Sequence, residues 1–442
     1  MHIKQKCITF VVYIKQKNRK IYFAYKMDKE LIKILIKENQ QKIMKISFVE
    51  RIVDIEPNFN YVFVGLRRVG KTYLMYQQIH SLIKKGHSIE EILFFNFEDD
   101  RIDKIELQDL DKIKKCYEEI YDHKPIFFLD EIQVVDRWEK FARRLADDKY
   151  RVYISGSNAK MLSKEIASTL GGRFLIQDVF PFSFQEYLLA KKIDVDAKNI
   201  IYEKYYEAIK LFENYFSDGG IPESMSADDK RAYLSSLYQK IYLGDICSRY
   251  QIRNDAALNF LVKKLAENLK QPTSYTRLAN IISSLGAKVA TATIIDYVNY
   301  IKDSWLVFSL ENMNSRFVER ETNKKYYFTD NGLLNLFLID PNTSLLENLV
   351  AVQLRKKYKE ELYYYHNGVE VDFVVPDERL AVQATYSLAD FDTRKREITA
   401  LGKLAQQMKL DKMLIITKDE EETIIENELK IEVIPIWKWL LS

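Results

Sequence analysis

The sequence has 442 residues, of which 47% are apolar and 30% charged, the proportions of an ordinary globular protein with two or three domains. Residues 1–26 hold seven lysines and arginines and no acid, whereas the remainder has 60 basic and 64 acidic residues and a net charge of −4. This balance excludes a generally basic surface that coats duplex nucleic acid. The apolar runs are too short to span a membrane, and the three scattered cysteines show no metal-ligand spacing and no disulfide framework. We therefore expect a cytoplasmic protein without membrane partners.

Five chain segments are predicted. Residues 1–46 form a basic N-terminal extension. Residues 47–182 alternate short, continuously apolar runs with helical stretches, the pattern of a parallel α/β domain whose sheet is covered on both faces. The expected strands are residues 61–66, 92–98, 125–131, 151–157 and 173–180.

The second half of the sequence changes pattern twice. Residues 183–270 show no strand pattern and predict a helical lid region. Residues 271–330 show helix–turn–helix spacing followed by β-like runs, which predicts a winged-helix-like domain. Residues 331–442 predict a second α/β domain, with helices at 345–358 and 393–408 and strands at 362–366, 369–375, 380–385 and 413–417.

The segment after the first strand matches the G-x-x-x-x-G-K-[ST] pattern of a phosphate-binding loop, or P-loop. Glycine at both ends lets the backbone curve and direct its N–H groups at phosphate oxygens, and the next helix adds its positive end. We expect Lys71 to reach the β- and γ-phosphates of ATP and the Thr72 hydroxyl to hold Mg²⁺. The predicted nucleotide-binding residues are Gly65, Leu66, Arg67, Arg68, Val69, Gly70, Lys71, Thr72 and Tyr73.

Polar residues that follow the later strands complete the predicted catalytic site. Asp130 is expected to hold Mg²⁺ and Glu131 to polarise an attacking water. Ser157 and Asn158 are candidates to contact the γ-phosphate or that water, or are polar turn residues. Arg173 is either a surface arginine or a charge delivered to the γ-phosphate of a neighbouring subunit in a homo-oligomer.

Several further segments carry a resemblance: LDEIQVVDRWEKFARRL, ISGSNAKML, LGGRF followed by PFSFQEYL, then GGIPE and DI-x-x-RY. With GLRRVGKT, they resemble the AAA+-related P-loop ATPases of archaea and bacteria, in which an uncharacterised C-terminal region with a restriction-endonuclease-like fold follows the ATPase. The resemblance runs from about residue 51 to the end. It implies strand order 5-1-4-3-2, a helical lid, Mg-ATP at Lys71 and Asp130, and Arg173 as the arginine of the GR motif.

The second helix of the winged-helix-like segment, residues 292–302, would be the one to enter a major groove. Its sequence has one lysine, one aspartate and no arginine. Phosphate-tracking surfaces carry more cations, so a packed or partner-binding winged helix is the alternative to DNA reading.

The C-terminal pattern matches a restriction-endonuclease-like core, in which carboxylates hold Mg²⁺ and a lysine stabilises developing charge. The corresponding residues, which we interpret as a vestigial nuclease site, are Glu347, Glu370, Asp372 and Gln383. Gln383 stands where an acid is expected and Thr385 where the lysine is expected, and an amide is a weaker Mg²⁺ ligand than a carboxylate. Lys395, on the following helix, is a candidate to supply the missing cation from another direction.

Three functions are compatible with the sequence. The leading hypothesis is an Mg²⁺-dependent ATPase that acts as a nucleotide switch on the winged-helix and nuclease-like domains, with DNA as a candidate partner. The second is an ATP-regulated DNA endonuclease. The third is a signalling ATPase that binds a protein partner without nucleic acid.

Overall fold

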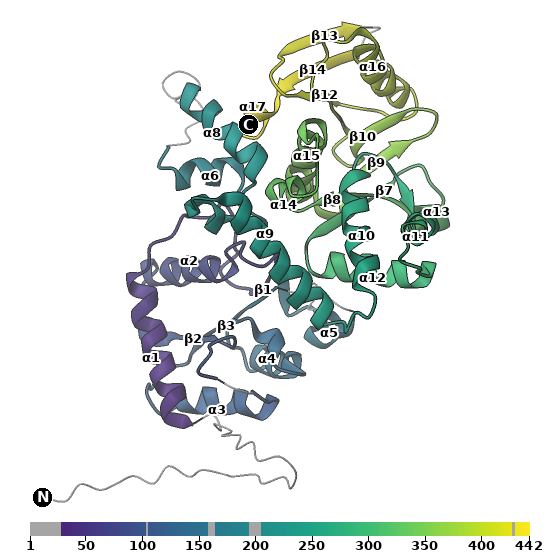
Figure 1. The fold of residues 1–442 in the computed structure, drawn as a ribbon. Helices are drawn as coiled ribbons and strands as arrows, with labels where there is room; N and C mark the ends of the chain where they lie inside the picture. Colours follow the sequence, from purple (N-terminus) through teal and green to yellow (C-terminus); the bar gives the residue numbers. More distant parts are fainter. Residues whose placement is uncertain (1–27, 103–104, 158–163, 194–204, 427–428) are drawn as a thin grey trace, which may run out of the picture.

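A computed structural model describes residues 28–102, 105–157, 164–193, 205–426 and 429–442 (Figure 1). In its N-terminal half, five strands form one parallel sheet in the order β2-β3-β4-β1-β5, which is the order implied by the resemblance. The strands are β1 (Asn60–Val64), β2 (Ile92–Asn96), β3 (Ile126–Asp130), β4 (Val152–Gly156) and β5 (Phe174–Asp178). All five predicted strands are thus confirmed.

Helices cover both faces of this sheet. They are α1 (Lys29–Lys45), α2 (Lys71–Lys84), α3 (Leu107–Glu118), α4 (Trp138–Asp147) and α5 (Lys164–Leu170), with short 3-10 turns η1 (Ile89–Glu91) and η2 (Ile132–Val134). Val62 and Val64 of β1 face the cluster formed with α1, α3 and α4. Tyr61 and Phe63 face the opposite cluster, which includes α2. This two-sided burial explains why the strand sequences are continuously apolar.

Helix α1 lies within the range that the sequence analysis assigned to an N-terminal extension. Its side chains Ile32, Leu35 and Ile36 are almost fully buried and pack in the same cluster as Val62. Residues 29–45 are therefore part of the P-loop domain's packing, because an amphipathic helix buries its apolar stripe wherever a sheet face is open.

A set of helices, drawn in teal in Figure 1, lies between the two sheets. They are α6 (Phe184–Ala190), α8 (Tyr205–Asp218), η4 (Pro222–Ser226), α9 (Lys230–Lys240), the π-helix η5 (Ile241–Ser248) and α10 (Asp255–Glu267). The described residues between 183 and 270 hold no strand, as the sequence predicts. One buried cluster runs from α2 through these helices into the C-terminal half.

The C-terminal half contains a nine-stranded sheet in the order β13-β14-β12-β11-β10-β9-β7-β8-β6. The strands are β6 (Thr273–Ser274), β7 (Val307–Asn312), β8 (Asn323–Phe328), β9 (Tyr363–His366), β10 (Glu370–Val375), β11 (Leu380–Ala384), β12 (Lys412–Thr417), β13 (Glu422–Glu426) and β14 (Leu429–Pro435). The helices are α11 (Tyr275–Ser284), α12 (Thr291–Asp303), α13 (Phe317–Thr322), α14 (Asn331–Asn335), α15 (Asn342–Tyr358), α16 (Phe391–Ala405) and α17 (Ile436–Trp439), with the 3-10 turn η6 (Lys359–Glu361).

The expected boundary after residue 330 falls between strands of this one sheet. Strand β7, from the winged-helix-like segment, pairs in parallel with β9 through Glu311 and Tyr363. The β7–β8 hairpin thus extends the C-terminal sheet, and β8 lies close to α15. Residues 271–330 and 331–442 therefore share both backbone hydrogen bonds and a core. Among the described helices, none combines the length and apolar character that a membrane span requires.

Candidate functional site

The P-loop connects β1 to α2 and depends on two glycines. A Cβ atom at Gly65 would lie 2.2 Å from the carbonyl oxygen of Val179, so no larger residue fits beside the neighbouring chain. Gly70, at the N-cap of α2, has a φ of 94°, a conformation that side chains strongly disfavour. Leu66 and Val69 are buried beneath the loop and fix its path. The loop therefore has the tight curvature that phosphate binding requires.

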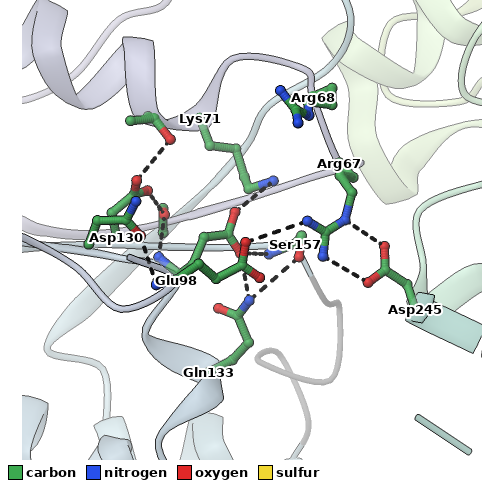
Figure 2. Close-up of polar contacts among 12 residues, drawn as sticks. Arg67, Arg68, Lys71, Glu98, Asp130, Gln133, Ser157 and Asp245 are labelled. Carbon is green, nitrogen blue, oxygen red and sulfur yellow. Dashed lines mark hydrogen bonds and ion pairs between the residues drawn. The ribbon is translucent and has the colours of Figure 1, made fainter. Parts of the chain in front are cut away.

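Lys71 is directed back at the crest of this loop. Its side chain is almost fully buried, and its Nζ donates to the carbonyl oxygens of Gly65 at 3.2 Å and Leu66 at 3.1 Å. The same ammonium lies 3.5 Å from Oε1 of Glu131 (Figure 2). A cation held inside a ring of backbone N–H groups is the arrangement that binds β- and γ-phosphates.

Thr72 and Asp130 form the predicted metal site. Thr72 Oγ1 donates to Oδ2 of Asp130 at 2.9 Å, and the hydroxyl of Ser155 donates to the other oxygen, Oδ1. Burial and the neighbouring charge of Glu131 raise the pKa of Asp130 above its usual range. A hydroxyl and a carboxylate side by side are the oxygen ligands that Mg²⁺ prefers, so the donor set fits this ion.

Glu131 lies where a catalytic base is expected, at the end of β3. Its Oε2 accepts from Gln133 Nε2 at 2.5 Å and from the backbone N–H of Ser157 at 3.2 Å. Burial opposes its ionisation, but the charge of Lys71 and the bond from Gln133 lower its pKa below the usual range. Glu131 is therefore held as an anion that can accept a proton.

Gln133 is a site residue that the sequence analysis missed. Its amide nitrogen contacts Glu131 and lies 3.5 Å from Ser157 Oγ, whereas its Oε1 is buried with no hydrogen-bond partner in the described residues. The only signal in the sequence is its place two residues after the acidic pair. A buried carbonyl oxygen without a partner is suited to hold a water.

The other residues predicted to belong to the nucleotide site lie in different places in the structure. Ser157 contacts Glu131 through its backbone, whereas Asn158 lies outside the described residues. Arg173 precedes β5, so it lies at the amino ends of the strands, opposite the carboxyl ends where the P-loop begins, and it pairs with Asp147 at 2.5 Å. Within one chain Arg173 is therefore not part of the nucleotide site. Tyr73 is half-exposed and contacts the ring of Tyr76 edge-on.

The paired arginines of the P-loop contact the helical region. Arg67 forms two bonds to Asp245, with Nε to Oδ2 at 2.9 Å and Nη2 to Oδ1 at 3.0 Å. Arg68 Nη1 contacts both carboxylate oxygens of Glu223, at 2.8 and 3.0 Å. Glu223 belongs to GGIPE and Asp245 to DI-x-x-RY, so these two motifs meet the P-loop in space.

The predicted vestigial nuclease site surrounds a lysine from another segment. Lys325 of β8 is fully buried, and its Nζ lies 2.6 Å from Glu370, 3.3 Å from Asp372 and 3.4 Å from Glu347. Burial raises the pKa of Glu347, as does the nearby charge of Asp372. The cation of this cluster therefore comes neither from residue 385, which is a threonine as expected, nor from Lys395, but from Lys325 on β8, which pairs with β7 and β6 in the same sheet.

Gln383 has a structural role beside this cluster. Its Oε1 accepts from the backbone N–H of Asp372 at 2.9 Å, and its Nε2 donates to the carbonyl of Glu370 at 3.0 Å. Both side-chain ends are thus used to fasten β11 to β10. A cavity of about 990 Å³ opens next to the cluster; its wall includes Glu347, Asp372, Lys395 and Arg396.

The parallel sheet of this order, the P-loop and the acidic pair at the end of β3 together define an AAA+-related P-loop ATPase fold. Comparison with known proteins agrees: residues 57–188 match the AAA domain family. Residues 209–343 and 342–439 match two domains of unknown function, DUF8612 and DUF4143.

Some relatives match this chain over nearly its whole length. The uncharacterized protein MJ1544 of Methanocaldococcus jannaschii is 33% identical over 430 residues, which cover 94% of this chain and 96% of the relative. An uncharacterized protein of Haemophilus influenzae is 29% identical over 90% of this chain and 99% of its own. Among solved structures, the Walker-type ATPase PABY2304 of Pyrococcus abyssi is 13% identical, with a TM-score of 0.36 over 71% of this chain and 96% of its own. The chain belongs to the family of MJ1544 and itself joins an AAA+-related P-loop ATPase domain to a C-terminal domain of unknown function.

Proposed function

We propose that this protein hydrolyses ATP with Mg²⁺ and that the bound nucleotide controls how the P-loop domain contacts the helical and C-terminal parts of the chain. The observation that carries the proposal is the grouping of Lys71, Thr72, Asp130 and Glu131 at the end of β1 and β3. This grouping supplies a phosphate-binding cation, two metal-binding oxygens and a base in one place.

Each residue has a distinct task in this proposal. Lys71 and the loop N–H groups bind the phosphates, and Thr72 and Asp130 hold Mg²⁺, which neutralises charge on the phosphate oxygens when bound. Glu131 accepts the proton of the attacking water, which Gln133 helps to orient through its free Oε1. Ser157 keeps Glu131 in place through its backbone N–H.

Direct contacts of the P-loop support the proposal that the nucleotide controls the rest of the chain. Arg67 and Arg68 bind Asp245 and Glu223 of the helical region, so any change in the loop reaches these helices without an intermediary. Arg173 remains a candidate for action on a neighbouring subunit, since it is partly exposed and lies away from the P-loop of its own chain; its pairing with Asp147 fits the alternative of a surface arginine.

The test is release of phosphate by the purified protein with Mg²⁺ and ATP. Lys71→Ala and Glu131→Gln are expected to reduce turnover at least ~100-fold, since each removes a group that acts in the chemical step. Lys84→Ala, at the exposed far end of the same helix, is the matched control and is expected to keep full turnover. Turnover that survives both active-site substitutions would exclude this site as its source.

Nuclease activity is not part of the proposal, because the ammonium of Lys325 occupies the space among the three carboxylates that would hold the metal. Incubation with plasmid and single-stranded DNA in Mg²⁺ or Mn²⁺ is expected to give no cleavage. Cleavage that is lost in Asp372→Ala would instead establish the endonuclease alternative.

The class of partner is tested by the same ATPase assay with and without added DNA. We propose DNA as a candidate partner, and stimulation of turnover by DNA would support it. Unchanged turnover would favour a protein partner, in keeping with the single lysine on the segment 292–302.

A further inference from the structure

The carboxylate of Asp245 contacts two guanidinium groups, that of Arg67 in the P-loop (Figure 2) and that of Arg249 at the end of its own helical segment. Arg67 Nη2 donates to Oδ1 of Asp245 at 3.0 Å, and Arg249 Nη2 reaches the same oxygen at 3.5 Å. Two guanidinium groups thus contact one carboxylate. Arginine binds carboxylates and phosphates with the same geometry, so this cradle accepts either.

Arg249 has a further donor that the carboxylate does not satisfy. Its Nη1 is buried and forms no hydrogen bond within the described part of the chain. Buried donors on charged groups are almost always paired, because an unpaired one loses its hydration without compensation. A terminal phosphate presents three oxygens where a carboxylate presents two, so it would occupy this cradle more completely.

Arg67 lies on the side of the nucleotide site where hydrolysis takes place. Its Nη1 is 3.5 Å from Oε2 of Glu98, just beyond the end of β2, and its charge contributes to the lowered pKa of Glu131. Glu131 in turn lies 3.5 Å from Lys71. Arg67 is therefore close to the residues assigned to the β- and γ-phosphates and to the attacking water.

The segment that carries Asp245 has an unusual backbone. Asp245 lies in η5, a π-helix of eight residues that follows α9 without a break. π-Helical turns are rare, usually consist of a single turn and occur mostly at functional sites. The bond to Arg67 thus ties the P-loop to a segment with an uncommon backbone geometry.

We propose that Asp245 takes the place of the terminal phosphate of ATP in the nucleotide-free protein, and that Arg67 and Arg249 bind this phosphate once it displaces the carboxylate. The inference rests on the proposed ATP-binding function and adds the group that senses the γ-phosphate. ADP lacks this phosphate, so Asp245 keeps its place when ADP is bound. Only ATP then frees η5 and the α10 helix that follows it.

A displacement of η5 would be passed to the C-terminal half of the chain through the packed side chains of α10. Leu258 and Leu261 of α10 are fully buried in the cluster that also holds Ile294 of α12 and Phe328 of β8. Close-packed helices transmit a displacement rather than absorb it. Asp245 is therefore a positioning residue, whereas Arg67 and Arg249 contact the substrate.

The test compares binding of ADP and of the non-hydrolysable analogue AMP-PNP, each with Mg²⁺, by titration calorimetry. Asp245→Asn removes the competing anion and is expected to raise AMP-PNP affinity about 5- to 30-fold while ADP affinity changes less than about twofold. Arg67→Gln and Arg249→Gln are expected to lower AMP-PNP affinity about tenfold with ADP again little changed. In an Arg67→Gln/Arg249→Gln double variant, Asp245→Asn is expected to have no further effect, because neither guanidinium group remains to be released.

Glu267→Gln, which removes an exposed acid of α10 paired with Lys264, is the matched control and should change neither affinity. Equal effects of Asp245→Asn on both nucleotides, or a loss of affinity for both, would show a purely structural ion pair and overturn the inference. That result differs from failure of the proposed function, in which the wild-type protein binds neither nucleotide and releases no phosphate.

Discussion

The guanidinium of Arg51 and the carboxylate of Glu186 form an ion pair at 2.9 Å that is almost completely shielded from solvent. Arg51 also donates to the carbonyl of Val69 in the P-loop at 2.8 Å, and Glu186 lies 3.4 Å from Lys356 of α15. Burial opposes the ionisation of Glu186, but the charges of Arg51 and Lys356 keep its pKa below the usual range. One charged chain thus connects the nucleotide loop to the helix that carries Glu347.

Arg51→Met is expected to destabilise the protein by about 3–5 kcal/mol, because it leaves a buried carboxylate and the Val69 carbonyl without their main partner. Urea unfolding followed by circular dichroism measures this change. Lys356→Met, which leaves the 2.9 Å pair intact, should cost clearly less. Equal losses from the two substitutions would show that Glu186 depends on both cations alike.

Lys325→Met is expected to cost about 3–5 kcal/mol near pH 8, since three carboxylates would face each other without a cation. The same substitution should create a site for a divalent cation, so Mn²⁺ should raise the unfolding temperature of the variant but not of the wild type. Thermal unfolding with and without Mn²⁺ tests both points.

Lys324→Met is the control for this experiment. Lys324 is the neighbouring residue on β8, and its partners Glu311 and Glu321 are partly exposed. We expect a smaller loss and no effect of Mn²⁺. Strong stabilisation of the wild-type protein by Mn²⁺ at this site would mean that the metal displaces Lys325.

Asp130→Asn and Thr72→Ala are expected to raise the Mg²⁺ concentration needed for half-maximal ATPase activity by about 10- to 100-fold, since each removes one oxygen ligand. Nucleotide affinity in EDTA should stay within about twofold of the wild type, because Lys71 and the loop still bind the phosphates. A parallel loss of affinity in EDTA would indicate that the loop itself had been disturbed.

The buried carboxylate of Asp330 leads us to expect that the stability of the protein depends on pH. Its carboxylate is buried and accepts from the backbone N–H groups of Gly220 at 2.8 Å and Leu333 at 3.1 Å, and burial raises its pKa to about 6. The folded state therefore binds this proton more tightly than the unfolded state does. Its contribution to stability is present below pH 4 and is lost as the pH rises through 6.

At about 1.4 kcal/mol per pKa unit, this contribution amounts to about 3 kcal/mol. Asp330→Asn is neutral at every pH, so the difference in unfolding free energy between pH 4.5 and pH 7.5 should shrink by about 2 kcal/mol, the part of this contribution that is lost over that range. Urea unfolding at the two pH values measures it. An unchanged difference would assign the pH dependence to other buried acids such as Glu347.

The P-loop and the five parallel strands could be predicted from the sequence because their signals are local. Gly65, Gly70, Lys71 and Thr72 lie within eight positions, and β1 to β4 are continuous apolar runs buried on both faces, whereas β5 at the sheet edge is partly exposed. The strands β13 and β14 were not predicted. Both have solvent-exposed positions, and charged residues interrupt their apolar runs, unlike the continuous runs of β2, β3 and β4.

The sequence by itself determined the phosphate-binding loop, the acidic pair at Asp130 and Glu131 and the order of the P-loop sheet, since these follow from neighbours in the chain and from the family resemblance. Only the tertiary structure paired Arg67 with Asp245, 178 positions away, and placed Lys325 among carboxylates on α15 and β10. Such partners are chosen by packing of distant elements, and no periodicity along the chain encodes them. The roles of the loop arginines and of the C-terminal lysine therefore depend on the fold as a whole.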